Sequence, residues 1–229
     1  GELFEVVTSK RGMGEDDAKK YFTQILLAMA HVHAQGVAHG DMKLQNLLLT
    51  ADKSACKVCD FGLAKYVTDD AFSTSRVKNS EYTAPEVLTN PTKHDATKAD
   101  MWACGVVLYC MVECKFPFQS PEQAEAAKYT LSGGRSEQFV EFLGKLLSPD
   151  VGKRYSAAEA LGDPWLVCGD ETTWRYLISR ELESYKGGDD RLRKPGNYLA
   201  RSDWEAQVKK LTGEAAEGVP PPDDEIEGF

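Results

Sequence analysis

Four polar side chains that could carry out chemistry lie close together in residues 39–62, HGDMKLQNLLLTADKSACKVCDFG. Asp41, Lys43 and Asn46 stand at relative positions 0, 2 and 5, and Asp60 follows farther along. A carboxylate can accept the proton of a hydroxyl group, an ammonium group can lie against a phosphate, and carboxylate and amide oxygens bind Mg²⁺. These residue types in this order therefore suit phosphoryl transfer.

A β-hairpin is expected to bring the two ends of this stretch together. Residues 47–49 and 56–59 have the patterns of short strands, and they flank the polar turn TADKSA. A hairpin with Asn46 at one end and Asp60 at the other returns both side chains to one place, as a shared Mg²⁺ requires. The C-x-x-C inside the second strand has no partner pair at the spacing of a zinc site, so we interpret both cysteines as strand residues.

Helices are expected on both sides of the hairpin. Residues 15–34 show an amphipathic pattern with an acidic first turn, and this helix would brace the catalytic stretch. Residues 97–112 are apolar on nearly all sides, which is typical of a helix at the centre of a core. Ser156 with Glu159 makes a capping box for a last short helix that ends near Pro164. A further amphipathic helix is indicated by apolar residues at helical spacing, namely Phe139, Phe142, Leu143, Leu146 and Leu147.

Composition and charge limit the classes of protein to which the chain can belong. Its 229 residues, 42% of them hydrophobic, can bury the core of one domain and leave an appendage. The net charge is −9, and residues 213–229 contain no Lys or Arg, which argues against a general nucleic-acid binder. The six cysteines indicate a reduced, intracellular protein of the cytoplasm or nucleus. No signal peptide is visible, and the longest apolar run, residues 101–112, is too short to span a membrane.

The chain resembles the larger, carboxy-terminal lobe of a eukaryotic protein kinase. The shared motifs, in the family's order, are H-R-D-x-x-x-x-N at residues 39–46, D-F-G at 60–62, A-P-E at 84–86, the start of the buried central helix at 100–105, and the closing segment at 153–155 with Pro164 and Trp165. The resemblance covers residues 1–168. It implies a mainly helical fold, that of the kinase large lobe with its small β-hairpin.

The resemblance implies a role for each polar residue of the opening stretch. Asp41 would be the base that orients the substrate hydroxyl, and Lys43 the cation that accompanies the γ-phosphate of ATP. Asn46 and Asp60 would hold Mg²⁺. Because this reaction depends on positioning and charge stabilisation, the loss of any of them should slow transfer by orders of magnitude.

Two further positions correspond to the family's nucleotide site. Glu2, in the opening GELF, resembles the residue that bonds the ribose, and Leu48 resembles the apolar residue under the adenine ring. Lys43 is typical of the serine/threonine branch, and the sequence as a whole is similar to the calmodulin-dependent and AMP-activated kinases. The resemblance therefore implies a protein serine/threonine kinase with ATP and Mg²⁺. Its partners would be a protein substrate and a regulatory protein or upstream kinase.

Other positions correspond to residues that hold the lobe together and control it. Glu86 and Arg154 match a family ion pair that pins the segment of residues 60–86 to the lobe. Asp100 would accept backbone N–H groups of the catalytic loop. Gly40 stands where many kinases have an Arg that pairs with a phosphorylated activation segment, and this difference argues against control by that pairing.

The family's smaller amino-terminal lobe is absent from this sequence, since neither G-x-G-x-x-G-x-V nor V-A-I-K occurs. We expect a kinase large lobe at residues 1–168, a helical extension at 169–212 and an acidic disordered tail at 213–229. Two hypotheses stay open. Either the sequence is part of a complete enzyme, which the absence of an initiator Met favours, or the protein is a catalytically inactive, pseudokinase-like scaffold that binds a protein partner.

Overall fold

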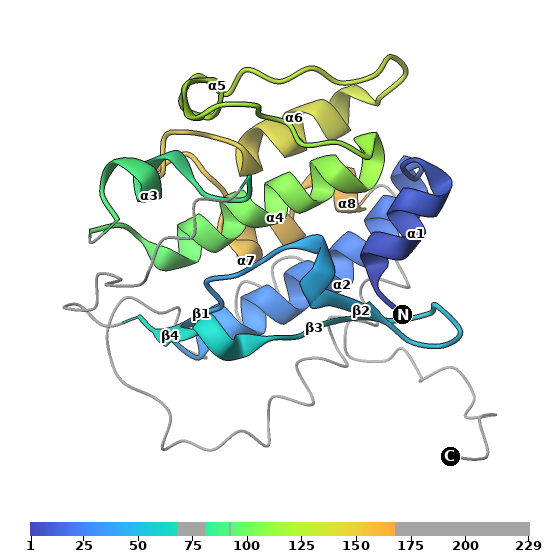
Figure 1. Cartoon of the computed structure of the whole chain (residues 1–229), viewed down its shortest axis with the longest axis horizontal. Helices are drawn as coiled ribbons and strands as arrows, with labels where there is room; N and C mark the ends of the chain where they lie inside the picture. Colours follow the sequence, from blue (N-terminus) through green and yellow to red (C-terminus); the bar gives the residue numbers. More distant parts are fainter. Residues whose placement is uncertain (68–80, 92, 168–229) are drawn as a thin grey trace, which may run out of the picture.

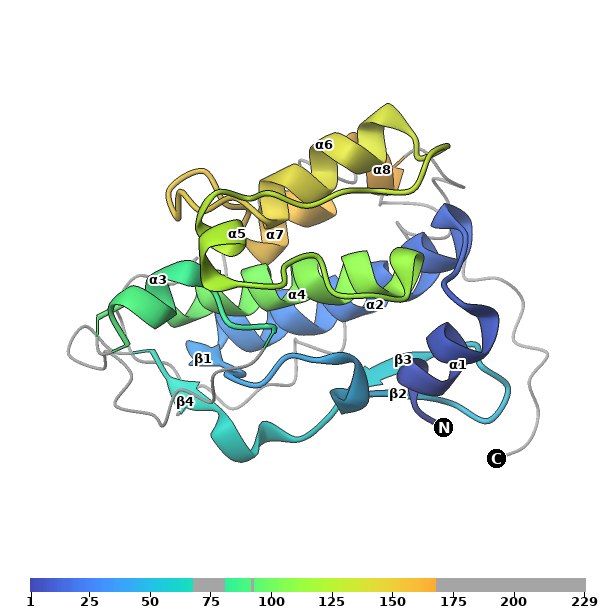
Figure 2. The same cartoon turned by 45° about the horizontal axis from the view of Figure 1, so that its top comes forward.

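Two long helices run through the middle of the molecule. The computed structural model describes residues 1–67, 81–91 and 93–167. Helices α2 (Glu15–Ala34) and α4 (Ala96–Glu113) lie side by side in both views (Figure 1, Figure 2). The extension and the acidic tail that are expected after residue 168 lie outside the described residues.

Helix α4 is the centre of the hydrophobic core because nearly all of its faces are apolar. Every residue from Asp100 to Val112 is buried. The helix is capped by Asp95, whose carboxylate accepts two N–H groups of the first turn. Gly105 lets helix α6 (Glu137–Leu146) approach closely, since a Cβ atom at this position would lie 2.9 Å from the Leu146 side chain.

The other helices are short and surround this pair. Figure 2 shows α6 on one side of α4 and the strands β2 and β3 on the other. The short helices are α1 (Leu3–Lys10), α3 (Pro85–Thr89), α5 (Pro121–Glu125), α7 (Ala157–Leu161) and α8 (Pro164–Val167), with the 3₁₀ turns η1 (Leu44–Asn46) and η2 (Phe61–Leu63).

Two small antiparallel sheets complete the described part of the chain. Strand β2 (Leu47–Leu49) pairs with β3 (Cys56–Val58), with Leu47 opposite Val58. Strand β1 (Val37–Ala38) pairs with β4 (Lys65–Tyr66). The two sheets flank the 3₁₀ turns, so they hold the stretch that contains the candidate catalytic residues at both ends.

Most of the expected elements are confirmed. The helix at residues 15–34 has the expected ends, and Ser156 and Glu159 form the expected capping box. The short apolar segment at the start of the chain is the helix α1, and α8 begins at Pro164, where the last helix was expected to end. The expected absence of the smaller lobe stays a prediction. None of the described helices is both long and apolar enough to cross a bilayer.

Candidate active site

Residues 39–46, named the catalytic loop for the candidate catalytic residues they contain, are attached to the buried helix α4 through Asp100. Its carboxylate accepts the backbone N–H groups of His39, at 2.8 Å, and of Gly40, at 2.9 Å. His33 of α2 brings its Nε2 atom to 2.9 Å from the same carboxylate. The expected bonds between Asp100 and the loop are thus confirmed, and the carboxylate that holds the loop also links the two central helices.

His33 is a residue whose partner the sequence did not identify. Its position continues the buried face of α2, which predicted only a histidine satisfied by its surroundings. Two features of the sequence together could have predicted the pairing. One is a titratable residue on the apolar face of a helix, and the other is a carboxylate in a second helix that is expected to be buried, because buried polar groups need partners. The pairing gives the Asp100 carboxylate a third donor.

Asp41, Lys43 and Asn46 are brought together by the turn η1 at the end of this loop. Lys43 Nζ lies 2.5 Å from Asp41 Oδ2, and the Asn46 side-chain amide donates to the same oxygen at 3.3 Å. Asn46 also donates to the Asp41 carbonyl oxygen at 2.7 Å, which holds the turn closed. One carboxylate oxygen therefore receives two donors, and the side chain has a defined orientation.

The hairpin returns Asp60 to the same region, as the sequence predicts. The backbone N–H of Cys59 donates to the Asn46 carbonyl oxygen at 2.9 Å, so Asp60 follows directly after a residue paired with Asn46. The Cys59 carbonyl oxygen lies 3.0 Å from His39 Nε2, which ties the end of the hairpin to the catalytic loop. Asp60 has a left-handed backbone, with φ of 62°, and caps η2 by accepting the Gly62 N–H.

Glu2 and Leu48 lie next to each other at the other side of the hairpin. They form an isolated antiparallel bridge, and Leu48 is 40% exposed. Burial and the charges of Asp60 and Glu2 raise the pKa of the Cys59 thiol. Because Leu48 pairs with Lys57 in the hairpin, the bridge places Glu2 along the outer edge of β2.

A cavity of about 700 Å³ lies beside the catalytic loop. Asp41, Lys43 and Asn46 line one part of it, and Tyr82 and Phe116, whose rings meet edge to face at 5.3 Å, line another. Asp60, Glu2 and Leu48 are not among the residues of its wall. The predicted site thus divides into a cavity with the candidate base and a neighbouring surface with the candidate nucleotide residues.

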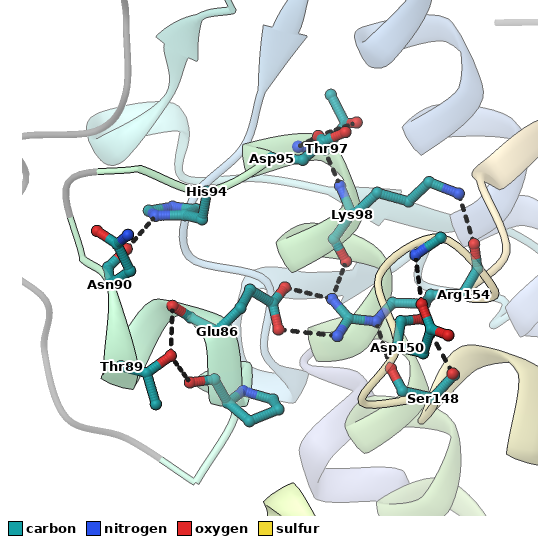
Figure 3. A network of polar contacts seen from close by, with 12 residues as sticks. Glu86, Thr89, Asn90, His94, Asp95, Thr97, Lys98, Ser148, Asp150 and Arg154 are labelled. Carbon is teal, nitrogen blue, oxygen red and sulfur yellow. Dashed lines mark hydrogen bonds and ion pairs between the residues drawn. The ribbon is translucent and has the colours of Figure 1, made fainter.

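The expected ion pair between Glu86 and Arg154 is present, and it is bidentate (Figure 3). Arg154 Nη1 and Nη2 lie 2.5 and 2.8 Å from the two Glu86 carboxylate oxygens. The guanidinium also donates to the carbonyl oxygens of Ser148 and Lys98, and it lies 5.0 Å from the centre of the Trp102 ring. This network fixes α3 and thereby the wall of the cavity that contains Tyr82.

Comparison with known proteins decides the family. The family model of the protein kinase domain matches residues 1–166. The chain belongs to the protein kinase family. This kinase is 34% identical over 220 residues to a probable myosin light chain kinase of Dictyostelium discoideum, covering 85% of the chain and 70% of the relative.

Two other relatives are matched over a smaller part of their length. The kinase is 36% identical over 184 residues to CDPK-related kinase 1 of Arabidopsis thaliana, covering 75% of the chain and 31% of the relative. It is 34% identical over 177 residues to the serine/threonine-protein kinase kin-29 of Caenorhabditis elegans, covering 75% of the chain and 21% of the relative. The kinase thus spans less than a third of these two proteins, and the resemblance to eukaryotic serine/threonine kinases is confirmed.

Proposed function

We propose that the chain is the catalytic lobe of a kinase that transfers the γ-phosphate of ATP to serine or threonine side chains of protein substrates. The observation that carries the proposal is the geometry at Asp41. Its carboxylate lies on the wall of the cavity and is oriented by Lys43 and Asn46. A carboxylate held in this way next to a cation is what transfer to a hydroxyl group needs.

Asp41 is the base in this proposal. Its side chain is 21% exposed, so a hydroxyl group of a second protein can approach it through the cavity. Lys43 is 29% exposed, which leaves its ammonium group free to turn from Asp41 toward a phosphate. The pair therefore serves two steps, because Lys43 orients the Asp41 carboxylate before binding and can then stabilise the transferred phosphoryl group.

Asn46 and Asp60 are the proposed ligands of Mg²⁺. Both offer oxygen atoms, which are the donors that this hard cation prefers, so the residues fit the metal. The backbone bond between Asn46 and Cys59 holds the two ligands at one end of the hairpin. When bound, Mg²⁺ would neutralise the charge of the phosphates.

Glu2 and Leu48 are proposed to hold the nucleoside. The exposed Leu48 side chain offers an apolar surface for an adenine ring, and Glu2 offers a carboxylate beside it that can accept a hydrogen bond from a ribose hydroxyl. Protein cover over this surface would strengthen binding, since ligand sites usually enclose most of the ligand.

The first test is the binding of Mg²⁺-ATP by the 229-residue chain, measured as the rise in melting temperature. Ligand binding stabilises the folded state by RT ln(1 + [L]/Kd), so even weak binding is visible at millimolar nucleotide. We expect Asp60→Asn to abolish the Mg²⁺-dependent part of the shift. The matched control is Asp52→Asn, in the turn at the opposite end of the hairpin, which should keep the full shift.

The second test is phosphoryl transfer to a library of serine and threonine peptides. Asp41→Asn should lower the transfer rate by about 10² to 10⁴, as expected for the loss of a general base, while the melting temperature without ligand stays close to that of the unchanged chain. Transfer that survives Asp41→Asn would refute the assignment of the base. A folded chain that binds no Mg²⁺-nucleotide would mean either that nucleotide binding requires the smaller lobe or that the protein is a pseudokinase-like scaffold, and capture of a protein partner by the chain would decide for the scaffold.

A further inference from the structure

His94 is a polar residue on the wall of the cavity that also contains Asp41, and no step of the proposed transfer uses it. It lies between α3 and α4, outside the catalytic loop. Figure 3 shows its imidazole ring beside Asn90, the residue that ends α3. His94 therefore belongs to a part of the cavity wall that is distinct from the candidate base.

The backbone fixes which nitrogen of the His94 ring carries the proton. His94 Nδ1 lies 3.3 Å from the carbonyl oxygen of Asn90. A carbonyl oxygen can only accept, so this hydrogen bond requires a proton on Nδ1. In the neutral ring, Nε2 is then an acceptor without a proton. Nε2 has no hydrogen-bond partner among the residues that the structure describes, so it is open to a ligand in the cavity.

The helices before and after His94 line the same cavity with small apolar side chains, which are Val87 from α3 and Ala96 and Ala99 from α4. Asp100 of α4 also lines it, but its carboxylate is occupied by the N–H groups of the catalytic loop. A charged side chain that entered among these apolar groups would lose hydration that they cannot replace. A neutral hydrogen-bond donor fits this part of the cavity better, because it loses less hydration and gains His94 Nε2 as its partner.

We propose that His94 is a specificity-determining residue, which accepts a hydrogen bond from a side chain of the protein substrate near the serine or threonine that is phosphorylated. The side chains that it selects are neutral donors, namely the hydroxyl groups of serine and threonine and the amides of asparagine and glutamine. This rests on the proposed function, in which Asp41 of the same cavity takes the reacting hydroxyl group. A site built around an acceptor discriminates against a side chain that leaves the acceptor unpaired.

The first test measures the binding of serine peptides to the 229-residue chain by fluorescence anisotropy, without nucleotide. The peptides form pairs that differ only by threonine or valine at one position near the central serine, and this position moves along the peptide from pair to pair. Threonine and valine have nearly the same shape, so each pair isolates the hydrogen bond of the hydroxyl group. We expect threonine to bind about three- to tenfold more tightly at one position. Equal affinities at every position, or no binding of any peptide, would overturn the proposal.

Substitutions of His94 then test whether this residue is the origin of the preference. His94→Phe keeps a flat ring and removes the acceptor, so threonine should lose its advantage over valine. His94→Gln offers a side-chain carbonyl oxygen and should restore part of the advantage, and it serves if the phenylalanine variant does not fold. The matched control is His31→Phe, since His31 is not a residue of the cavity wall, and it should keep the full preference. A preference that survives in His94→Phe would overturn the proposal.

A peptide with lysine at the same position tests a charged side chain instead. The Glu81 carboxylate also lines the cavity and could attract such a side chain. We expect lysine to bind no more tightly than valine, because its charge would have to enter the apolar part of the cavity beside His94. Tighter binding of lysine than of threonine, lost in Glu81→Gln and kept in His94→Phe, would overturn the proposal.

The second test observes the ring nitrogens of His94 by NMR in chain labelled with isotope-enriched histidine, with His94→Phe to identify the signals. We expect the proton on Nδ1 in the free chain, and a change of the Nε2 signal with the threonine peptide but not with the valine peptide. A proton on Nε2 in the free chain would overturn the proposal. Because neither test needs nucleotide, a chain that passes both but neither binds Mg²⁺-ATP nor transfers phosphate would refute the proposed function and leave His94 as part of a peptide-binding site.

Discussion

Two ion pairs in this molecule have equally short contacts and very different surroundings. Lys43 and Asp41 meet at 2.5 Å, and so do Arg154 and Glu86. The Arg154 side chain is fully buried and has two backbone carbonyl groups as additional partners, whereas the Lys43 and Asp41 side chains are 29% and 21% exposed beside a cavity. Contact distance alone therefore does not distinguish the buried ion pair from the pair that is proposed to take part in phosphoryl transfer. The number of other partners and the access of solvent do.

The largest expected effect on stability is that of Arg154→Met. The substitution leaves the Glu86 carboxylate without its cation in a mostly buried place, so the free energy of unfolding should fall by about 3 to 5 kcal/mol. Urea denaturation followed by circular dichroism measures it. The control is Lys153→Met, since the Lys153 side chain is 81% exposed in its pair with Asp150, and this variant should change stability by no more than about 0.5 kcal/mol.

A loss of less than about 1 kcal/mol in Arg154→Met would contradict the comparison, because that value is typical of exposed pairs. Substitution of the other partner, Glu86→Gln, gives a second measurement of the same ion pair. It keeps the shape of the side chain and removes the charge that the buried guanidinium needs, so it should also destabilise the fold by several kcal/mol.

The second expected effect is that of Asp100→Asn, at the point where the catalytic loop joins the core. The new amide group presents N–H donors to a site in which Asp100 accepts two backbone N–H groups, so about 1 to 3 kcal/mol should be lost. Asp95→Asn in the same helix is the control, since Asn is an equally good N-cap and should be nearly neutral. Equal stability of the two variants would show that α4 does not hold the loop.

The third expected effect is small, and it is the direct counterpart of the first. Lys43→Met removes the cation of the partly exposed pair, and solvent can hydrate the remaining Asp41 carboxylate. The free energy of unfolding should therefore change by less than about 1 kcal/mol in the same denaturation experiment. A loss as large as that of Arg154→Met would mean that Lys43 is fixed in place, and would argue against its turning toward a phosphate.

The smallest expected effect concerns Glu113, another enclosed carboxylate, and the way in which it makes the stability of the fold depend on pH. Burial alone would raise its pKa, but hydrogen bonds from Ser132 and Arg135 outweigh burial and lower the pKa from its ordinary value of 4.5. Because the folded-state pKa is the lower one, the stabilisation is complete above the unfolded-state pKa. It is lost as the pH falls through the folded-state value.

Glu113→Gln removes this contribution. Between about pH 5 and pH 3, the free energy of unfolding should therefore fall less steeply in the variant than in the unchanged chain. Denaturation curves recorded at several pH values measure the two slopes. Parallel slopes would show that the hydrogen bonds from Ser132 and Arg135 do not favour the ionised form of Glu113.

Local features of the fold could be predicted from the sequence because their signals are local. The helix at residues 15–34 has an acidic first turn and regular apolar spacing, and Ser156 with Glu159 defines a cap by itself. The hairpin followed from two short strand patterns around a polar turn. The roles of Asp41 and Asp60 came from the resemblance to the family, and the structure adds the contacts around them.

Contacts between distant segments could not be predicted in this way. Glu15 was expected only as part of an acidic first turn, yet its carboxylate also accepts hydrogen bonds from Ser136 and from the Trp165 ring, 150 residues away. Periodicity describes which face of a helix is buried, but not which residue lies opposite. The same holds for His33, which was placed on the buried face of α2 without its partner Asp100.

The ion pair of Glu86 and Arg154 also bears on the order in which the chain folds. It joins residues 68 positions apart, whereas the hairpin bond joins Asn46 to Cys59. Closing the longer loop costs about 1.5 kcal/mol more conformational entropy, so the hairpin should form first. Mutational φ-values near one at Leu47 and near zero at Glu86 would show this order, in which the candidate metal ligands meet before the cavity beside them is enclosed.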